Sequence, residues 1–186
     1  PMPDENSMEG ARRLTQVAKG VDKHTLVINL ISGGGSALFC MPFDGVSLED
    51  KRETTRILLA SGATINEMNC IRKHISKVKG GGLAEIARPA RLINLILSDV
   101  MGNHIDAIAS GICSPDSTTF SDALSILRKY GIENELPQSV RRLIRLGADG
   151  DIPETPKAGH PAFGNMVNII LGDNKLACDA AYPVSY

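Results

Sequence analysis

The chain has 186 residues and a formal net charge of −1 at pH 7, with a pI near 6.5. A nearly neutral chain with 4% aromatic residues lacks the basic surface and the stacking platforms of nucleic-acid-binding proteins, so we expect no nucleic-acid partner. No apolar run approaches membrane-spanning length and the N-terminus has no signal-peptide pattern, which predicts a cytoplasmic protein with no membrane partner. The cysteines lie far apart without metal-ligand spacing and are expected to be free thiols: Cys40, Cys70, Cys113 and Cys178.

A hydrophobic content of 42% supports a packed core, and the apolar residues recur in segments of helix and strand length. Two helices begin at capping boxes, in which Ser47 pairs with Asp50 and Thr64 pairs with Glu67. Ser121 is the expected cap of a later helix. In chain order, we expect helices over residues 6–19, 48–60, 65–77, 83–87, 122–129 and 138–146 and from 174, and strands over 25–31, 92–97 and 166–171.

The first strand leads into the most informative turn of the chain, Ser32-Gly33-Gly34-Gly35-Ser36. The strand's Val, Ile and Leu residues do not alternate with polar ones, which is typical of a strand buried on both faces of a parallel sheet. The glycines let backbone N–H groups approach a ligand, and a helix beginning at Ala37 would favour anions at its N-terminus. The turn is not a Walker A loop, because no Gly-Lys-Ser/Thr follows at the required spacing. It is not a complete dinucleotide fingerprint either, because Leu38 stands where the third glycine should be. It predicts a cradle for phosphate or carboxylate, and a tight turn without a ligand is the alternative.

The second capped helix carries a polar stripe. Asn69, Arg72, Lys73 and Ser76 follow the spacing i, i+3, i+4, i+7 and therefore share one face. Lys79 and the glycines after it continue the basic, flexible character of this segment. The stripe predicts anion binding, while a solvated polar face is the alternative.

The second strand ends at Ser98-Asp99. A carboxylate at the carboxyl end of a parallel strand lies where ligands bind in open α/β sheets, so Asp99 is a candidate site residue. Capping of a turn is the alternative role for this aspartate. A long polar loop follows through Ser110 and Asp116, and loops of this length in compact domains tend to be functional.

Strands that alternate with helices predict an α/β fold, a Rossmann-like three-layer sandwich with a mostly parallel sheet covered by helices. The polar strand ends then meet at one edge, where anion donors, cations and a carboxylate would suit phosphoryl transfer. A nicotinamide-dependent reductase and a non-catalytic anion-binding module are the competing hypotheses. An incomplete dinucleotide fingerprint argues against the reductase.

These motifs, taken in order, resemble the class II glycerate 2-kinase family, the MOFRL-associated glycerate kinases that were long labelled hydroxypyruvate reductases. The likeness covers nearly the whole chain. Its main motifs are Ser32-Gly33-Gly34-Gly35-Ser36-Ala37-Leu38, Ser61-Gly62-Ala63-Thr64-Ile65, Glu67-Met68-Asn69, Arg72-Lys73-His74-Ile75-Ser76, Leu97-Ser98-Asp99-Val100-Met101-Gly102, Ile108-Ala109-Ser110-Gly111 and Pro115-Asp116.

The resemblance implies a kinase that uses ATP and Mg²⁺ to phosphorylate the 2-hydroxyl of D-glycerate, giving 2-phosphoglycerate. Residues 1–186 would form part of its N-terminal Rossmann-like domain, with the C-terminal domain absent. A cleft between two domains needs both walls, so we expect this chain to be inactive alone. The resemblance leaves a homodimer open.

The resemblance also implies roles for individual residues. Asp99 would be the active-site aspartate, acting as general base or holding a metal, and Lys79 would join it in catalysis. Asp116 would be a further metal ligand. Asn103 departs from the family's usual aspartate at this position, which puts a second metal-orienting carboxylate in doubt. Substrate and phosphate would be bound by Ser32, Gly33, Gly34, Gly35, Ser36, Asn69, Arg72, Lys73, Ser110 and Asn174.

Overall fold

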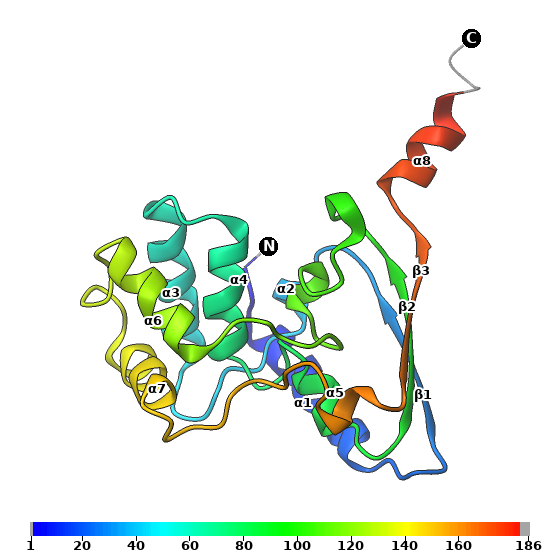
Figure 1. Ribbon diagram of the computed structural model, residues 1–186, viewed down its shortest axis with the longest axis horizontal. Coiled ribbons are helices and arrows are strands. Elements are labelled where there is room, and N and C mark those ends of the chain that lie inside the picture. Colours follow the sequence, from blue (N-terminus) through cyan, green and yellow to red (C-terminus); the bar gives the residue numbers. More distant parts are fainter. Residues whose placement is uncertain (1, 183–186) are drawn as a thin grey trace.

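The computed structural model describes residues 2–182 and contains a sheet of three parallel strands. The strands β1 (Leu26–Ile31), β2 (Arg91–Leu97) and β3 (Met166–Gly172) lie in the order β1-β2-β3 (Figure 1). In this register, Ile93 of the central strand pairs with Ile28 on one side and with Val167 on the other. The predicted α/β class with a parallel sheet is confirmed, and the carboxyl ends of the strands meet at one edge.

Helices α1 (Glu5–Lys19) and α5 (Gly82–Ile86) pack on one face of this sheet. The central strand contributes Leu92 and Ile96 to the core beneath them, each 1% exposed. A row of amides crosses the same face, because Asn29 Nδ2 donates to Asn94 Oδ1 and Asn94 Nδ2 donates to Asn168 Oδ1, both at 2.7 Å. The buried polar atoms of the sheet are therefore paired with one another.

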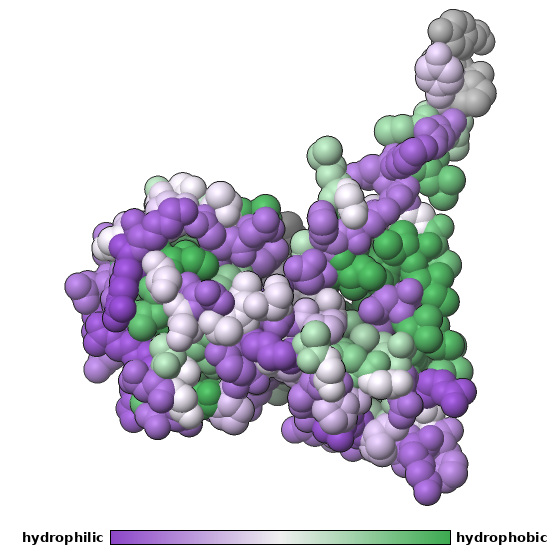
Figure 2. Space-filling model, viewed as in Figure 1, coloured by the Kyte–Doolittle hydropathy of each residue, from purple (hydrophilic) through white to green (hydrophobic). Residues whose placement is uncertain are grey.

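The opposite face of the sheet is apolar and open to solvent. Its side chains on β1 and β3 are between 41% and 81% exposed: Leu26, Ile28, Leu30, Val167, Ile169 and Leu171. Figure 2 shows hydrophobic residues gathered over the sheet. The prediction that the first strand is buried on both faces is wrong for the part of the chain that the structure describes, because no helix there covers this side. Helix α8 (Asn174–Ala181) extends away from it instead (Figure 1).

Four helices form a separate cluster beside the sheet layer: α3 (Leu48–Ala60), α4 (Ile65–His74), α6 (Phe120–Lys129) and α7 (Gln138–Ala148) (Figure 1). They enclose a second core around Leu58, Ile71 and Phe120. Gly147 allows α7 to approach α6, because a Cβ at this position would lie 2.2 Å from the Phe120 ring. The remaining short elements are α2 (Gly35–Leu38) and the 3₁₀ turns η1 (Met101–Asn103), η2 (Ile108–Ser110) and η3 (Pro161–Phe163).

Local capping signals located most helix starts. Both predicted capping boxes are present at the starts of α3 and α4. The predicted cap Ser121 is wrong, because Thr119 caps α6 and shares a reciprocal capping box with Asp122. Helix α4 ends at His74, three residues before the predicted end, and the next residues turn back so that Ser76 forms a β-bridge with Pro42. None of the helices within residues 2–182 is long and apolar enough to cross a membrane.

Candidate active site

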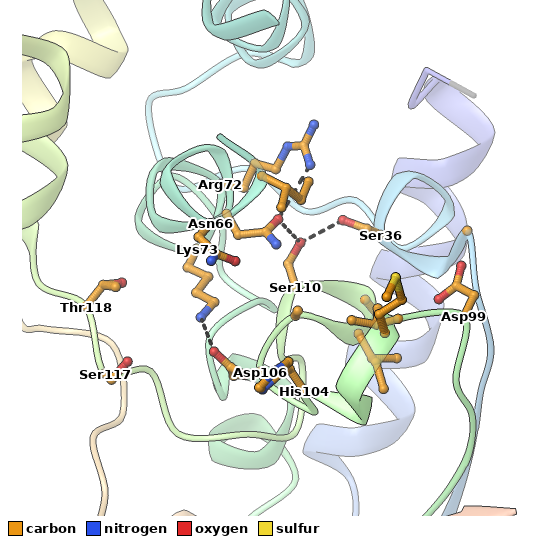
Figure 3. A pocket seen from close by; sticks show the side chains of 18 residues that line it. Ser36, Asn66, Arg72, Lys73, Asp99, His104, Asp106, Ser110, Ser117 and Thr118 are labelled. Carbon is orange, nitrogen blue, oxygen red and sulfur yellow. Dashed lines mark hydrogen bonds and ion pairs between the residues drawn. The ribbon is translucent and has the colours of Figure 1, made fainter. Parts of the chain in front are cut away.

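A cleft of about 700 Å³ opens at the carboxyl edge of the sheet, next to the helical cluster (Figure 3). The turn after β1 and the long loop after β2 form one part of its wall, and α4 forms another. The residues predicted from the sequence that line it are Gly34, Ser36, Asn69, Arg72, Lys73, Asp99 and Ser110. The glycine turn and the carboxylate that follows the second strand thus share one pocket, as predicted.

Gly33 and Asp99 are in direct contact beside the cleft. A Cβ at Gly33 would lie 2.2 Å from Asp99 Oδ2, so a larger residue cannot occupy the position without displacing the carboxylate. The next residue, Gly34, has a φ of +77°, which L-residues with side chains adopt only with strain. Asn174 Nδ2 donates to the backbone carbonyl of Asp99 at 3.3 Å and so supports this segment from outside the cleft.

The predicted anion cradle depends on the loop and not on a long helix. Helix α2 spans four residues, Gly35–Leu38, so its own dipole is small and contributes little to anion binding at its N-terminus. Gly35 packs against Ala109 instead, with a Cβ-to-Cβ separation that would be 3.6 Å. Ser32 precedes the part of the turn that lines the cleft.

Two neighbouring cations of α4 have different partners. Lys73 is buried, and its Nζ lies 3.3 Å from Asp116 Oδ1. It also lies 3.9 Å from Asp106 Oδ2 (Figure 3). Arg72 is half-buried, and no carboxylate pairs with it in the part of the chain that the structure describes. Burial lowers the pKa of Arg72, yet guanidinium groups stay charged at neutral pH. Arg72 is therefore the better candidate for binding an anionic ligand.

Lys79 lies behind the wall of the cleft. Its side chain is 1% exposed, and its Nζ donates to the Ser36 carbonyl at 2.8 Å, to Ser36 Oγ at 3.0 Å and to the Ala109 carbonyl at 3.4 Å. Burial, reinforced by nearby Lys51, holds the pKa of Lys79 well below its usual value. A catalytic role for this lysine stays a prediction.

Strained backbone places the Ser110 hydroxyl in the cleft wall. Ala109 and Ser110 have φ values of 51° and 59°, in the left-handed region that non-glycine residues seldom occupy. The segment after α4 holds them, because Gly80 N–H donates to the Ser110 carbonyl at 3.1 Å and Gly81 N–H donates to the Gly111 carbonyl at 2.7 Å. The Ser110 hydroxyl then lies 2.8 Å from Ser36 Oγ (Figure 3).

Asp116 is fully buried and directs its carboxylate into the protein. It accepts hydrogen bonds from Lys73, from the amide and hydroxyl of Thr118, and from the Thr155 hydroxyl at 2.9 Å. Burial raises its pKa, but the hydrogen bonds from Thr118 and the charge of Lys73 outweigh burial and leave the pKa lowered. Residues 2–182 contain no cluster of three or more His, Cys, Asp or Glu side chains arranged for a metal ion. A metal role for Asp116 stays a prediction.

Other residues of the cleft were not identified from the sequence: Asn66, His104, Asp106, Ser117 and Thr118. Asn66 lies one helical turn before Asn69, so extending the polar stripe backwards would have found it. The others belong to the long polar loop, for which the sequence carries no periodicity. Asn103, the departure from the family pattern, donates to Asp173 Oδ2 at 2.6 Å.

A family model described as "Domain of unknown function (DUF4147)" matches residues 1–145. The chain belongs to the DUF4147 family. Relatives of this DUF4147 chain include a glycerate 2-kinase of Pyrococcus horikoshii, 46% identical, and a D-glycerate 2-kinase of Thermotoga maritima, 44% identical. Each comparison covers 97% of this chain and 40% of the relative. The chain therefore spans about two fifths of the length of these relatives.

A solved structure supports the same relationship. The crystal structure of a Thermotoga maritima glycerate kinase superposes with a TM-score of 0.86 at 42% sequence identity, and the match covers 100% of this chain and 43% of that one. The resemblance to the glycerate 2-kinase family that the motifs indicated is confirmed.

Proposed function

We propose that this chain forms one wall of the active site of a kinase that transfers a phosphoryl group from ATP to the 2-hydroxyl of D-glycerate. The observation that carries the proposal is the contact between the glycine turn and Asp99 in a cleft that Arg72 also lines. The relatives named glycerate 2-kinase and D-glycerate 2-kinase supply the substrate class.

The arrangement suits an alcohol acceptor. Asp99 is an exposed carboxylate at the end of a central strand, where it can accept the hydroxyl proton as the phosphoryl group is transferred. Backbone N–H groups of the glycine turn and the Arg72 guanidinium can offset negative charge on phosphate or carboxylate.

Magnesium fits this donor set. Mg²⁺ is commonly held by one or two carboxylates together with substrate phosphates, and Asp99 and Asp106 are the carboxylates that line the cleft within residues 2–182. When bound, the ion would supply positive charge to the phosphates. Asp106 would then help to hold the ion, Asp99 would stay available to accept the hydroxyl proton, and the loop N–H groups would orient the nucleotide. The cytoplasmic location and the homodimer stay predictions.

The test is an assay of the full-length protein that contains this chain, supplied with ATP, Mg²⁺ and D-glycerate. We expect ADP and 2-phosphoglycerate in equal amounts, with the position of the phosphate assigned by ³¹P and ¹H NMR. The chain of residues 1–186 alone serves as the control and is expected to show no turnover. Oxidation of NADH by hydroxypyruvate without phosphoryl transfer would instead support a reductase.

A further inference from the structure

A chain of hydrogen bonds runs along the cleft wall and starts at Lys79. Lys79 Nζ donates to Ser36 Oγ at 3.0 Å, Ser36 Oγ lies 2.8 Å from Ser110 Oγ, and Ser110 Oγ donates to Asn69 Oδ1 at 3.2 Å. Its members come from four separate segments, namely α2, α4, the segment after α4, and η2. The chain therefore ties α4 to α2 and to the long loop that follows β2.

Each hydroxyl has a single proton, so the direction of the chain is fixed. Ser110 uses its proton on Asn69, and Ser36 must therefore donate to Ser110. Ser36 can do so because Lys79 donates to its oxygen. The amino group of Lys79 also donates to two backbone carbonyls, those of Ser36 and Ala109. An ammonium group at Lys79 has three N–H donors, and these three oxygens accept them without a carboxylate among them.

The chain determines how the Asn69 amide is oriented. Its Oδ1 faces two donors, Ser110 Oγ and Arg72 at 3.5 Å, so the amide group must turn Nδ2 the other way. Within residues 2–182, Nδ2 has no acceptor. Every fully buried side-chain polar atom of these residues has a partner, so Nδ2 is not fully buried. Asn69 lines the cleft, so Nδ2 faces its interior as a free donor beside the Arg72 guanidinium.

We propose that Lys79 is a positioning residue that acts through Ser36 and Ser110 to hold the Asn69 amide and Arg72 as a binding site for the carboxylate of the hydroxy acid. This inference rests on the proposed function, because it takes D-glycerate as the acceptor. A planar amide N–H and a guanidinium are well suited to a carboxylate, which accepts hydrogen bonds on both oxygens. Lys79 itself does not touch the ligand.

Another lysine of this region provides a matched control. Lys51 on α3 is also buried, 4% exposed, and its Nζ donates to Cys40 Sγ at 3.2 Å. It does not belong to the chain that leads to Asn69. Replacing either lysine by methionine buries a similar volume, and only the substitution at Lys79 removes the donor to Ser36.

The experiment compares Lys79→Met, Ser110→Ala, the double variant and Lys51→Met in the full-length protein. We expect Lys79→Met and Ser110→Ala each to raise KM for D-glycerate roughly tenfold, with kcat and KM for ATP changed less than about threefold. Because both substitutions interrupt one chain, the double variant should match the weaker-binding single variant and should not multiply the two losses. Lys51→Met should keep the parental constants.

Calorimetric titration of D-glycerate into each protein without nucleotide measures Kd. The same variants can then be compared without turnover. An unchanged Kd in Lys79→Met would overturn the positioning role alone, as would a rise in KM for ATP or an equal effect of Lys51→Met. A loss of kcat with Kd preserved would make Lys79 a catalytic residue. A parent protein that binds D-glycerate and transfers no phosphate would overturn the proposed function. The Kd of Lys79→Met compared with that of the parent would still decide the positioning role.

Discussion

The backbone of Gly33 lies against the carboxylate of Asp99, so closely that a Cβ on the glycine would be 2.2 Å from Oδ2. The two residues are 66 positions apart in sequence and lie in the turns that follow two adjacent parallel strands. Their contact joins the candidate phosphate cradle to the candidate general base. Any change at Gly33 therefore acts on the geometry of Asp99.

Replacement of Gly33 by alanine tests this contact. We expect Gly33→Ala to lower kcat/KM about 100-fold, because a displacement of the base by an ångström is enough for a loss of that size. Gly10→Ala is the control, since neither glycine has a positive φ and the Cβ position of Gly10 has nothing within 4 Å. Steady-state kinetics of the full-length protein make the measurement. Equal losses in both variants would show that contact with Asp99 is not the cause.

The role of Asp99 predicts a selective loss of turnover. Asp99→Asn keeps the shape of the side chain and removes its basicity, so we expect kcat to fall about 100-fold or more while KM for D-glycerate changes little. Asp149→Asn is the control, since it makes the same substitution at an exposed aspartate that does not line the cleft. Turnover that survives Asp99→Asn would rule out proton transfer to this residue.

The buried carboxylate of Asp116 predicts a loss of stability. Asp116→Asn weakens its interaction with Lys73, which then keeps only the longer contact to Asp106, and we expect the free energy of unfolding to fall by about 3 kcal/mol. Asp44→Asn removes the partner of Lys77 at an exposed site and should cost less than about 1 kcal/mol. Urea titration at pH 7 measures both. A small effect at Asp116 would argue that the Thr118 and Thr155 contacts suffice.

Glu67 predicts a dependence of stability on pH. A hydrogen bond from Lys129, together with others from Thr64 and Tyr130, lowers its pKa from 4.5 to about 2. Since the pKa is lower in the folded state, the stabilisation is complete above pH 4.5 and is lost as the pH falls towards 2. The difference in Tm between the parent and Glu67→Gln should therefore shrink over this interval. Glu135→Gln is the control, since Glu135 is exposed and has no salt bridge within residues 2–182. A difference independent of pH, or one matched by Glu135→Gln, would contradict the assignment.

Local signals in the sequence located much of the fold. The capping boxes at Ser47 and Thr64 depend on residues three apart, so they are visible without tertiary structure. The meeting of the glycine turn with Asp99 followed from one rule, that parallel strands place their carboxyl ends together. Both predictions are confirmed because they rest on chain geometry.

Predictions that depended on packing were less complete. Arg72 and Lys73 are adjacent cations in the sequence, and only the fold shows that Lys73 is paired with Asp116. Lys79 belongs to the same basic stretch, yet the early end of α4 at His74 turns its segment into the core. The exposure of Leu30 depends on what covers the sheet, which a strand's own composition does not encode.

The open aliphatic surface of β1 and β3 has a practical consequence for handling residues 1–186. Leu30 is 81% exposed within a band of like side chains, and in the part of the chain that the structure describes both strands flanking β2 are edge strands. In buffer of low ionic strength, the polypeptide should self-associate as the protein concentration rises. It should also bind to a phenyl resin and to the dye ANS. Mild detergent should disperse it.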